Sequence, residues 1–272
     1  MKMKRLLLSA IGLVLAAGTA SAADLAVRPY TKAPPPAAVV FSWTGFYLGG
    51  SVGGHWGEDR LTTTTAPTNF VGGFPAALDA ASGTTLRPQG WIAGVQGGYN
   101  WQVSQFVVGV EADASWLDGN GSRAVVFGAL GPTLTGTFMN DSAKATFLAT
   151  VRGRAGVAFD RGLIYVTGGA AFGELKTADR LGFPGNFLDA NSATTHRTGW
   201  TVGAGAEYAF TSDWSVKAEY LYVDLGTVNV GLACTAAPCV VANDAIVHHR
   251  YTDNIGRIGL NYRFGGPVVA RY

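Results

Sequence analysis

The chain has few charged residues, only two cysteines and, after its first residues, no long apolar run. Asp, Glu, Lys and Arg make up 14% of its 272 residues, against roughly 25% in typical soluble domains. The formal net charge is +2 and no basic cluster occurs, which argues against a nucleic-acid-binding protein. No later segment reaches the roughly 20 apolar residues of a membrane-spanning helix. Because 48% of the residues are hydrophobic, the apolar content must be spread over short segments, as strands spread it.

The first residues have the pattern of a secretory signal. Basic residues at positions 2, 4 and 5 precede an apolar stretch over 6–17, and the small residues Ala20-Ser21-Ala22 follow. This order predicts a signal peptide over residues 1–22; the alternative, a retained anchor, is disfavoured because the stretch is too short to cross a bilayer. Residues 23–42 are rich in proline and predict an extended leader in the periplasm.

The two cysteines, Cys234 and Cys239, are separated by Thr-Ala-Ala-Pro. An exported chain passes through an oxidising compartment, so we expect a disulfide that closes this tight loop. A reduced pair is the alternative. A metal site is disfavoured because two thiols lack further ligands nearby.

From residue 43 onward, apolar and polar residues alternate with a period of two. Residues 106–116 are the clearest case, with apolar residues at even positions and mostly polar residues at odd ones. Residues 144–159 and 257–264 repeat the pattern, and in the first of these Lys144 shares the polar side with Arg152 and Arg154. A period of two predicts strands with one apolar and one polar face.

Eight such segments alternate with short and long connections. The expected strands lie near 43–56, 89–102, 105–118, 144–159, 163–175, 198–210, 214–225 and 250–264. Long connections are expected over 57–88, 119–143, 176–197 and 226–249. This alternation is typical of transmembrane barrels, and each strand reaches the roughly 9–11 residues that a tilted membrane strand needs. The sequence therefore predicts an all-β fold, an eight-stranded antiparallel transmembrane β-barrel with up-and-down meander topology, over residues 43–264, followed by a tail over 265–272.

The charged residues on the polar faces are balanced in sign. We expect them to form a charge-paired lumen, because unpaired charge inside a narrow barrel would be costly; they are Glu111, Asp113, Arg152, Arg154, Glu207, Lys217, Glu219, Arg257 and Arg263. Aromatic residues stand at the strand ends on the apolar faces, which indicates two interfacial girdles. A soluble barrel would point its apolar faces inward, and these two features favour the membrane barrel.

Three segments carry a resemblance to a known family. They are Trp43 to Gly50 (WTGFYLGG), Trp214 to Tyr220 (WSVKAEY) and Gly259 to Phe264 (GLNYRF). With the Pro-rich leader, they make the chain similar to the small outer-membrane β-barrel proteins of alphaproteobacteria, the porin-family or OmpA/OmpX-like proteins. The resemblance implies an abundant protein of the cell outer membrane. It also implies an aromatic assembly signal in the last strand, at Tyr262 and Phe264 or at the terminal Tyr272.

The sequence holds no hydrolase, zinc-protease or phosphate-loop motif, so we expect neither an enzyme nor a cofactor. Glu111 and Asp113 are interpreted as partners in structural ion pairs. His248 and His249, beside Arg250 and Tyr251, are candidates for binding haem iron. The alternative for this histidine pair is a solvated boundary between a loop and a strand.

Eight strands enclose a space that side chains can fill, whereas open porins use about 16–18. The expected function is therefore a structural barrel that supports envelope integrity and displays surface loops. The alternatives are a narrow porin for small solutes and a surface receptor for haem or a host molecule. Expected partners are outer-membrane lipid, lipopolysaccharide and the barrel-assembly machinery.

Overall fold

The computed structural model describes residues 41–65, 83–126, 138–183, 186–189, 193–233 and 242–264. The signal peptide, nearly all of the leader, the cysteine pair at 234 and 239 and the tail with Tyr272 lie outside the described residues. Within the described ranges, no helix has the length and hydropathy needed to cross a membrane.

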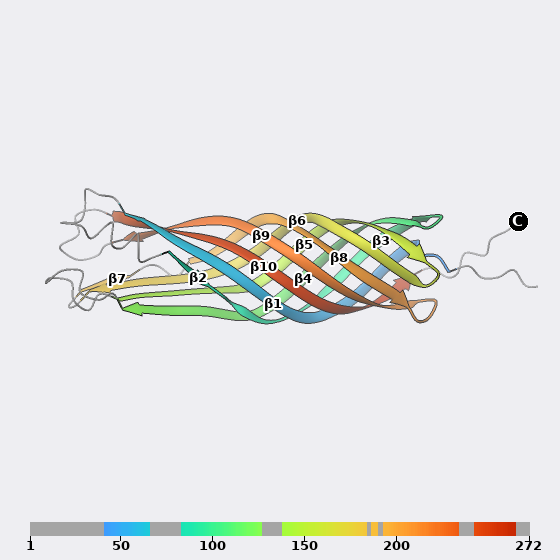
Figure 1. Ribbon diagram of the computed structural model, residues 1–272, viewed down its shortest axis with the longest axis horizontal. Helices are drawn as coiled ribbons and strands as arrows, with labels where there is room; N and C mark the ends of the chain where they lie inside the picture. Colours follow the sequence, from blue (N-terminus) through green and yellow to red (C-terminus); the bar gives the residue numbers. More distant parts are fainter. Residues whose placement is uncertain are drawn as a thin grey trace, which may run out of the picture. The chain divides into compact units, whose positions relative to one another are not determined.

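Eight long antiparallel strands form a closed ring, which confirms the predicted fold (Figure 1). Each long strand pairs with the next one along the chain, and the last pairs with the first from Phe46–Phe264 to Thr65–Ala245. Closure is required in hydrocarbon, because each unpaired backbone group there costs several kcal/mol. The strands are β1 (Gly45–Thr65), β3 (Gln89–Val103), β4 (Phe106–Val126), β5 (Phe138–Phe159), β6 (Gly162–Phe183), β8 (Ala193–Ala209), β9 (Trp214–Ala233) and β10 (Ala242–Phe264).

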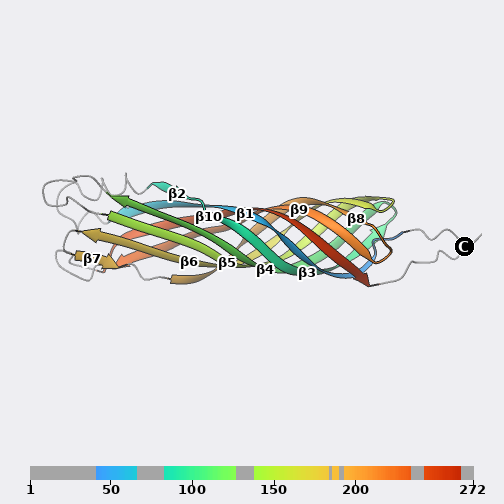
Figure 2. The same ribbon diagram turned by 90° about the horizontal axis from the view of Figure 1, so that it is seen from below.

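Tight turns lie at one end of the barrel. Ser104–Gln105 joins β3 to β4, Asp160–Arg161 joins β5 to β6, and residues 210–213 join β8 to β9. Ser104 and Asp160 have left-handed φ values of 56° and 50°, a conformation that a short polar side chain such as Asp tolerates. Two short strands, β2 (Thr84–Leu86) on β1 and β7 (Asn186–Asp189) on β6, extend the sheet. Figure 2 shows β7 at the end of the barrel opposite the tight turns.

The strands extend well into the segments predicted as long connections, so those boundaries were wrong. Six of the eight strands are 20 to 23 residues long, about twice what a membrane crossing needs. The extensions were missed because their outward positions are polar, as in Thr62 and Thr64, which removes the apolar alternation that marks a membrane strand.

β-Bulges change the inward-facing positions of two strands. In β5, Leu148, Thr150 and Arg152 face inward at even positions, but a bulge between Ala145 and Phe147 moves the inward face to odd positions. Lys144 therefore points outward, and its predicted place on the same face as Arg152 is wrong, because one extra residue reverses every side chain beyond it. A bulge in β9 does the same around Gly226, which adopts the left-handed φ of 72° that such bulges use.

The outer surface changes from apolar to polar at the level of four outward-facing tryptophans, Trp56, Trp91, Trp116 and Trp200. Toward the tight turns, most outward positions are apolar and many carry large exposed side chains such as Val110, as hydrocarbon requires of a barrel. Beyond the tryptophans, on the same strands, the outward positions are polar, as in Arg60 and Ser122. The barrel thus has an apolar band and a longer polar extension.

Candidate functional site

The inward faces of five strands bring eight charged residues together. These residues, called the central charge cluster below, are Glu111 and Asp113 of β4, Arg152 and Arg154 of β5, Glu207 of β8, Lys217 and Glu219 of β9 and Arg257 of β10. All are buried, and four acids meet four bases. The strand register places three opposite-charge pairs directly across from each other, Glu111 and Arg152, Glu207 and Lys217, and Glu219 and Arg257.

Glu111 binds the largest number of partners in this cluster. The Lys217 ammonium lies 3.0 Å from both of its carboxylate oxygens, and Arg152 Nη2 lies 2.5 Å from Oε1. The Tyr47 hydroxyl donates to Oε2 at 2.7 Å. Both oxygens of this buried carboxylate are therefore satisfied by charged or hydroxyl donors, as a buried charge requires.

Arg152 and Arg257 join the remaining acids to this centre. Arg152 donates to Asp113 at 2.9 Å and to Glu219 at 3.1 Å, while Arg257 donates to the same two carboxylates at 3.1 and 2.6 Å. Since each acid is shared by two guanidinium groups, the removal of one member leaves several buried charges short of a partner.

A second group of contacts surrounds Glu207. Arg154 donates to its Oε2 at 2.9 Å, and Ser215 and Asn261 donate to Oε1 at 2.6 and 2.8 Å. The Arg154 guanidinium lies 3.9 Å from the ring centroid of Tyr165, which is a cation–π contact. Arg154 also approaches Glu111 at 3.7 Å, so both groups form one connected network across the lumen.

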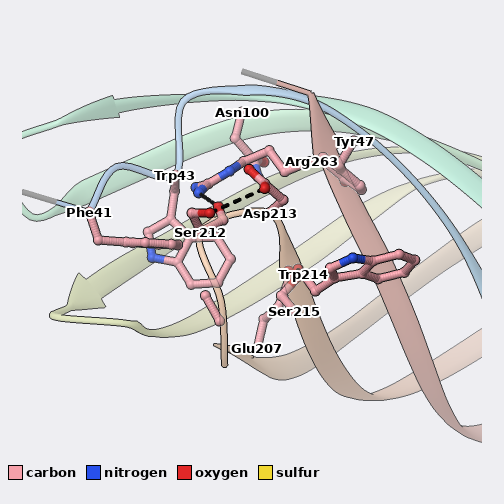
Figure 3. A pocket seen from close by; sticks show the side chains of 11 residues that line it. Phe41, Trp43, Tyr47, Asn100, Glu207, Ser212, Asp213, Trp214, Ser215 and Arg263 are labelled. Atoms are coloured by element: carbon pink, nitrogen blue, oxygen red, sulfur yellow. Dashed lines mark hydrogen bonds between the residues drawn. The ribbon is translucent and has the colours of Figure 1, made fainter. Parts of the chain in front are cut away.

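Arg263, the ninth predicted lumen residue, lies apart from this cluster at the barrel mouth near the tight turns. It donates to the backbone oxygens of Ser42 and Ser212, and its guanidinium lies 4.3 Å from the Phe41 ring centroid. Figure 3 shows Arg263, Phe41 and Trp43 around this mouth. Residues 41–44, directly before β1, therefore lie across the opening.

Trp43 packs into the opening. Its side chain is 2% exposed and packs edge-to-face on Phe41, with 5.2 Å between ring centroids. Its backbone N–H donates to the Gln102 side chain at 2.6 Å. A hollow of about 10 Å³ remains beside it, which is about the space of one water molecule. The sequence pattern predicts Trp43 at the start of a strand and carries no signal for this inward packing.

An apolar layer fills the lumen at the level of the outward tryptophans. Ile92 and Leu117 follow Trp91 and Trp116 directly, so their side chains point inward. The layer consists of Ile92, Leu117, Ala145, Leu148, Ala171, Leu175, Leu221, Val223, Leu225, Tyr251 and Ile255. A hollow found among these residues again measures about 10 Å³. On the side of the central charge cluster that faces the polar extension, the lumen is therefore packed like the core of a soluble protein.

Two buried histidine–aspartate pairs lie in the lumen between β1 and β10. His55 Nδ1 is 3.0 Å from Asp253, which also accepts a bond from the Tyr251 hydroxyl at 3.1 Å. His249 Nδ1 is 2.8 Å from Asp59. The contact between His249 and Asp59 was missed because both residues fall in segments predicted as loops, although His55, Gly57 and Asp59 share the same alternation. The contact between His55 and Asp253 depends on the pairing of the first strand with the last.

His248 and His249, the candidate haem ligands, face opposite sides of β10. The His248 ring points outward toward Asn229, at 2.6 Å, whereas His249 is buried in the lumen. Neighbouring residues of a strand diverge in this way, so the two imidazoles cannot reach one iron from the same side. Among the described residues, no three His, Cys, Asp or Glu side chains gather as a metal site.

Of the predicted assembly signal, Tyr262 and Phe264 face outward at the end of β10. Their rings lie 5.0 Å apart between centroids, and Tyr262 also contacts Trp214 at 5.1 Å. They belong to the aromatic girdle beside the tight turns.

Comparison with known proteins identifies the family of this chain. The family described as outer membrane protein beta-barrel domain matches residues 10–264. The 31 kDa outer-membrane immunogenic protein of Brucella melitensis is 36% identical over 265 residues, covering 96% of this chain and all of that protein. The 25 kDa outer-membrane immunogenic protein of the same species is 28% identical, covering 96% of this chain and 99% of that protein. Among solved structures, the outer membrane protein OprG of Pseudomonas aeruginosa is 12% identical with a TM-score of 0.49, covering 83% of this chain and 99% of that one. The chain belongs to the outer membrane protein beta-barrel family and is a protein of the cell outer membrane.

Proposed function

We propose that this protein is a closed, non-catalytic barrel that supports the outer membrane and displays the connections between its long strands at the cell surface. The observation that carries the proposal is the filling of the lumen at three successive levels. These are the Trp43 closure at the mouth, the central charge cluster and the apolar layer.

Each level opposes the passage of a solute for a different reason. The mouth and the apolar layer leave hollows of about 10 Å³, too small for anything larger than water. At the charged level, an ion would have to displace partners that already bind each other at hydrogen-bond distance, and breaking buried ion pairs costs several kcal/mol. These features favour a structural role over the alternative of a narrow porin.

The polar extension supports the display role. From Trp56 to Thr65, β1 continues for nine residues, or roughly 30 Å along the strand at about 3.3 Å per residue. Long connections of membrane barrels lie on the external side. The extension would carry them away from the lipid surface, where lipopolysaccharide surrounds the barrel.

Conductance of the purified protein in planar bilayers tests the proposal. We expect no single-channel steps over hours of recording, with a general porin inserted in parallel as the positive control. Folding is verified independently, because a folded barrel migrates differently on a gel before and after boiling. Regular single-channel steps from protein that passes this check would overturn the proposal and favour the porin.

A further inference from the structure

The outward face of β8, β9, β10 and β1 carries a groove inside the apolar band. It is a shallow hollow that is open to the lipid side. Its floor is made of small residues, Ala204, Ala218 and Gly256, and larger side chains stand around it, Val52, Tyr220 and Ile258. The register places Ile258 between Val52 and Ala218, so the groove runs across neighbouring strands.

The rim of the groove toward the polar extension holds a polar side chain on the lipid-facing side. Asn254 Oδ1 accepts a hydrogen bond from the Tyr220 hydroxyl at 2.5 Å, and its amide donates to the Trp56 backbone oxygen at 3.4 Å. The Trp56 ring lies against Gly256, since a Cβ added there would be 3.5 Å from the ring. An amide carries two N–H donors, and these contacts use one of them.

Two arginines lie on the same outward face, farther along the strands in the polar extension. Arg60 and Arg250 stand directly opposite each other on β1 and β10, with side chains 70% and 58% exposed. Each contacts one acid, Glu58 at 3.6 Å and Asp224 at 3.1 Å, which leaves most guanidinium donors facing solvent. Like charges directly across a strand pair are destabilising, and a bound anion would remove that cost.

We propose that this face binds one phosphorylated glycolipid of the outer leaflet, of the lipid A class. An acyl chain lies in the groove, the Asn254 amide meets the polar linkage at its upper end, and Arg60 and Arg250 bind a phosphate. From Gly256 to Arg250 the strand covers six residues, roughly 20 Å at about 3.3 Å per residue, which suits a lipid lying along the strand. The inference concerns the lipid-facing outside and is independent of whether the lumen is closed.

A second copy of the chain is the competing occupant of the groove. In a membrane, a two-fold dimer built on this face would place both arginine pairs at the same height and near each other. Like-charge juxtaposition across an interface costs several kcal/mol, so the arginines that would attract a phosphate oppose a dimer.

Native mass spectrometry of the full mature protein, titrated with purified lipid A in a zwitterionic detergent, tests the proposal. Arg60→Gln with Arg250→Gln removes the phosphate contacts, and Ala204→Leu with Ala218→Leu fills the groove. The matched controls lie elsewhere on the ring. Lys144→Gln with Lys176→Gln removes another basic pair whose members stand opposite each other on neighbouring strands. Ala114→Leu with Ala149→Leu enlarges another outward pair of alanines.

We expect Arg60→Gln with Arg250→Gln to weaken lipid A binding by at least roughly tenfold, since it removes the charge-assisted hydrogen bonds to the phosphate. We expect a loss of similar size from Ala204→Leu with Ala218→Leu, because the new side chains occupy the space of the acyl chain. Both control pairs should bind like the wild type, and all variants should shift on boiling as folded barrels. Equal binding by all variants would mean unspecific annular lipid and overturn the proposal. Phosphatidylglycerol binding as tightly as lipid A would overturn the assignment to a glycolipid, and a dimer that Ala204→Leu with Ala218→Leu abolishes would overturn lipid as the occupant.

Discussion

Replacing Glu111 by Gln tests whether the central charge cluster stabilises the barrel as a unit. The substitution keeps the size of the side chain but removes the charge that Lys217 and Arg152 bind at 3.0 and 2.5 Å. Arg152 retains other acids, but the next acid for Lys217 is Glu219 at 4.0 Å. An ammonium that is almost fully buried therefore loses its close partner. Removing one member of a buried pair costs about 3–5 kcal/mol, so we expect Glu111→Gln to lower the free energy of unfolding by about that amount.

Urea unfolding in lipid vesicles, followed by tryptophan fluorescence, measures this change. Glu58→Gln is the matched control, because Glu58 forms an exposed ion pair with Arg60 and exposed pairs contribute about 0–1 kcal/mol. The double variant Glu111→Gln with Lys217→Met removes both charges and should recover part of the loss, which a double-mutant cycle reports as coupling. If Glu111→Gln stays within about 1 kcal/mol of the wild type and shows no coupling to Lys217→Met, the reasoning about a dry, tightly paired lumen is refuted.

Two further predictions concern close packing inside the barrel and the limits of the apolar band. Gly119→Ala should lower the free energy of unfolding by about 1–3 kcal/mol in the same assay, because the new Cβ would lie 2.4 Å from His55 Nε2. Gly153→Ala is the control and should be nearly neutral, since its Cβ would meet nothing closer than 4.0 Å. Equal costs for the two variants would contradict the close packing around Gly119. Val110→Arg, in the exposed apolar band, should cost about 2–4 kcal/mol, whereas Ser122→Arg, beyond Trp116 on the same strand, should change stability by less than about 1 kcal/mol. A similar loss of stability for both variants would mean that the lipid does not end near Trp116.

The sequence predicted the parts of the strands whose apolar outward face contrasts with a polar inward face. It did not predict the parts of the strands in which both faces carry polar residues. Residues 106–116 alternate cleanly because lipid selects large apolar residues on one side and a narrow lumen selects small or charged ones on the other. Past Trp56, outward threonines and charges face water, so the pattern no longer distinguishes a strand from a polar loop. The pair of His249 with Asp59 was missed for this reason, since both residues lie in the strand extensions. The pair of His55 with Asp253 lies within predicted strands and depends instead on the closure of β1 against β10.

The fold class, the number of long strands and the side of the sheet on which each charge of the central cluster lies could all be predicted from the amino-acid pattern. This is possible because the strand period of two and the tight turns are local properties. The identity of the acid that meets each base required the three-dimensional structure, since those contacts depend on ring closure and on register across the lumen. The same holds for the outward direction of Lys144, because a bulge reverses the alternation, and for the fold of Trp43 into the mouth, because that packing depends on residues from opposite ends of the chain.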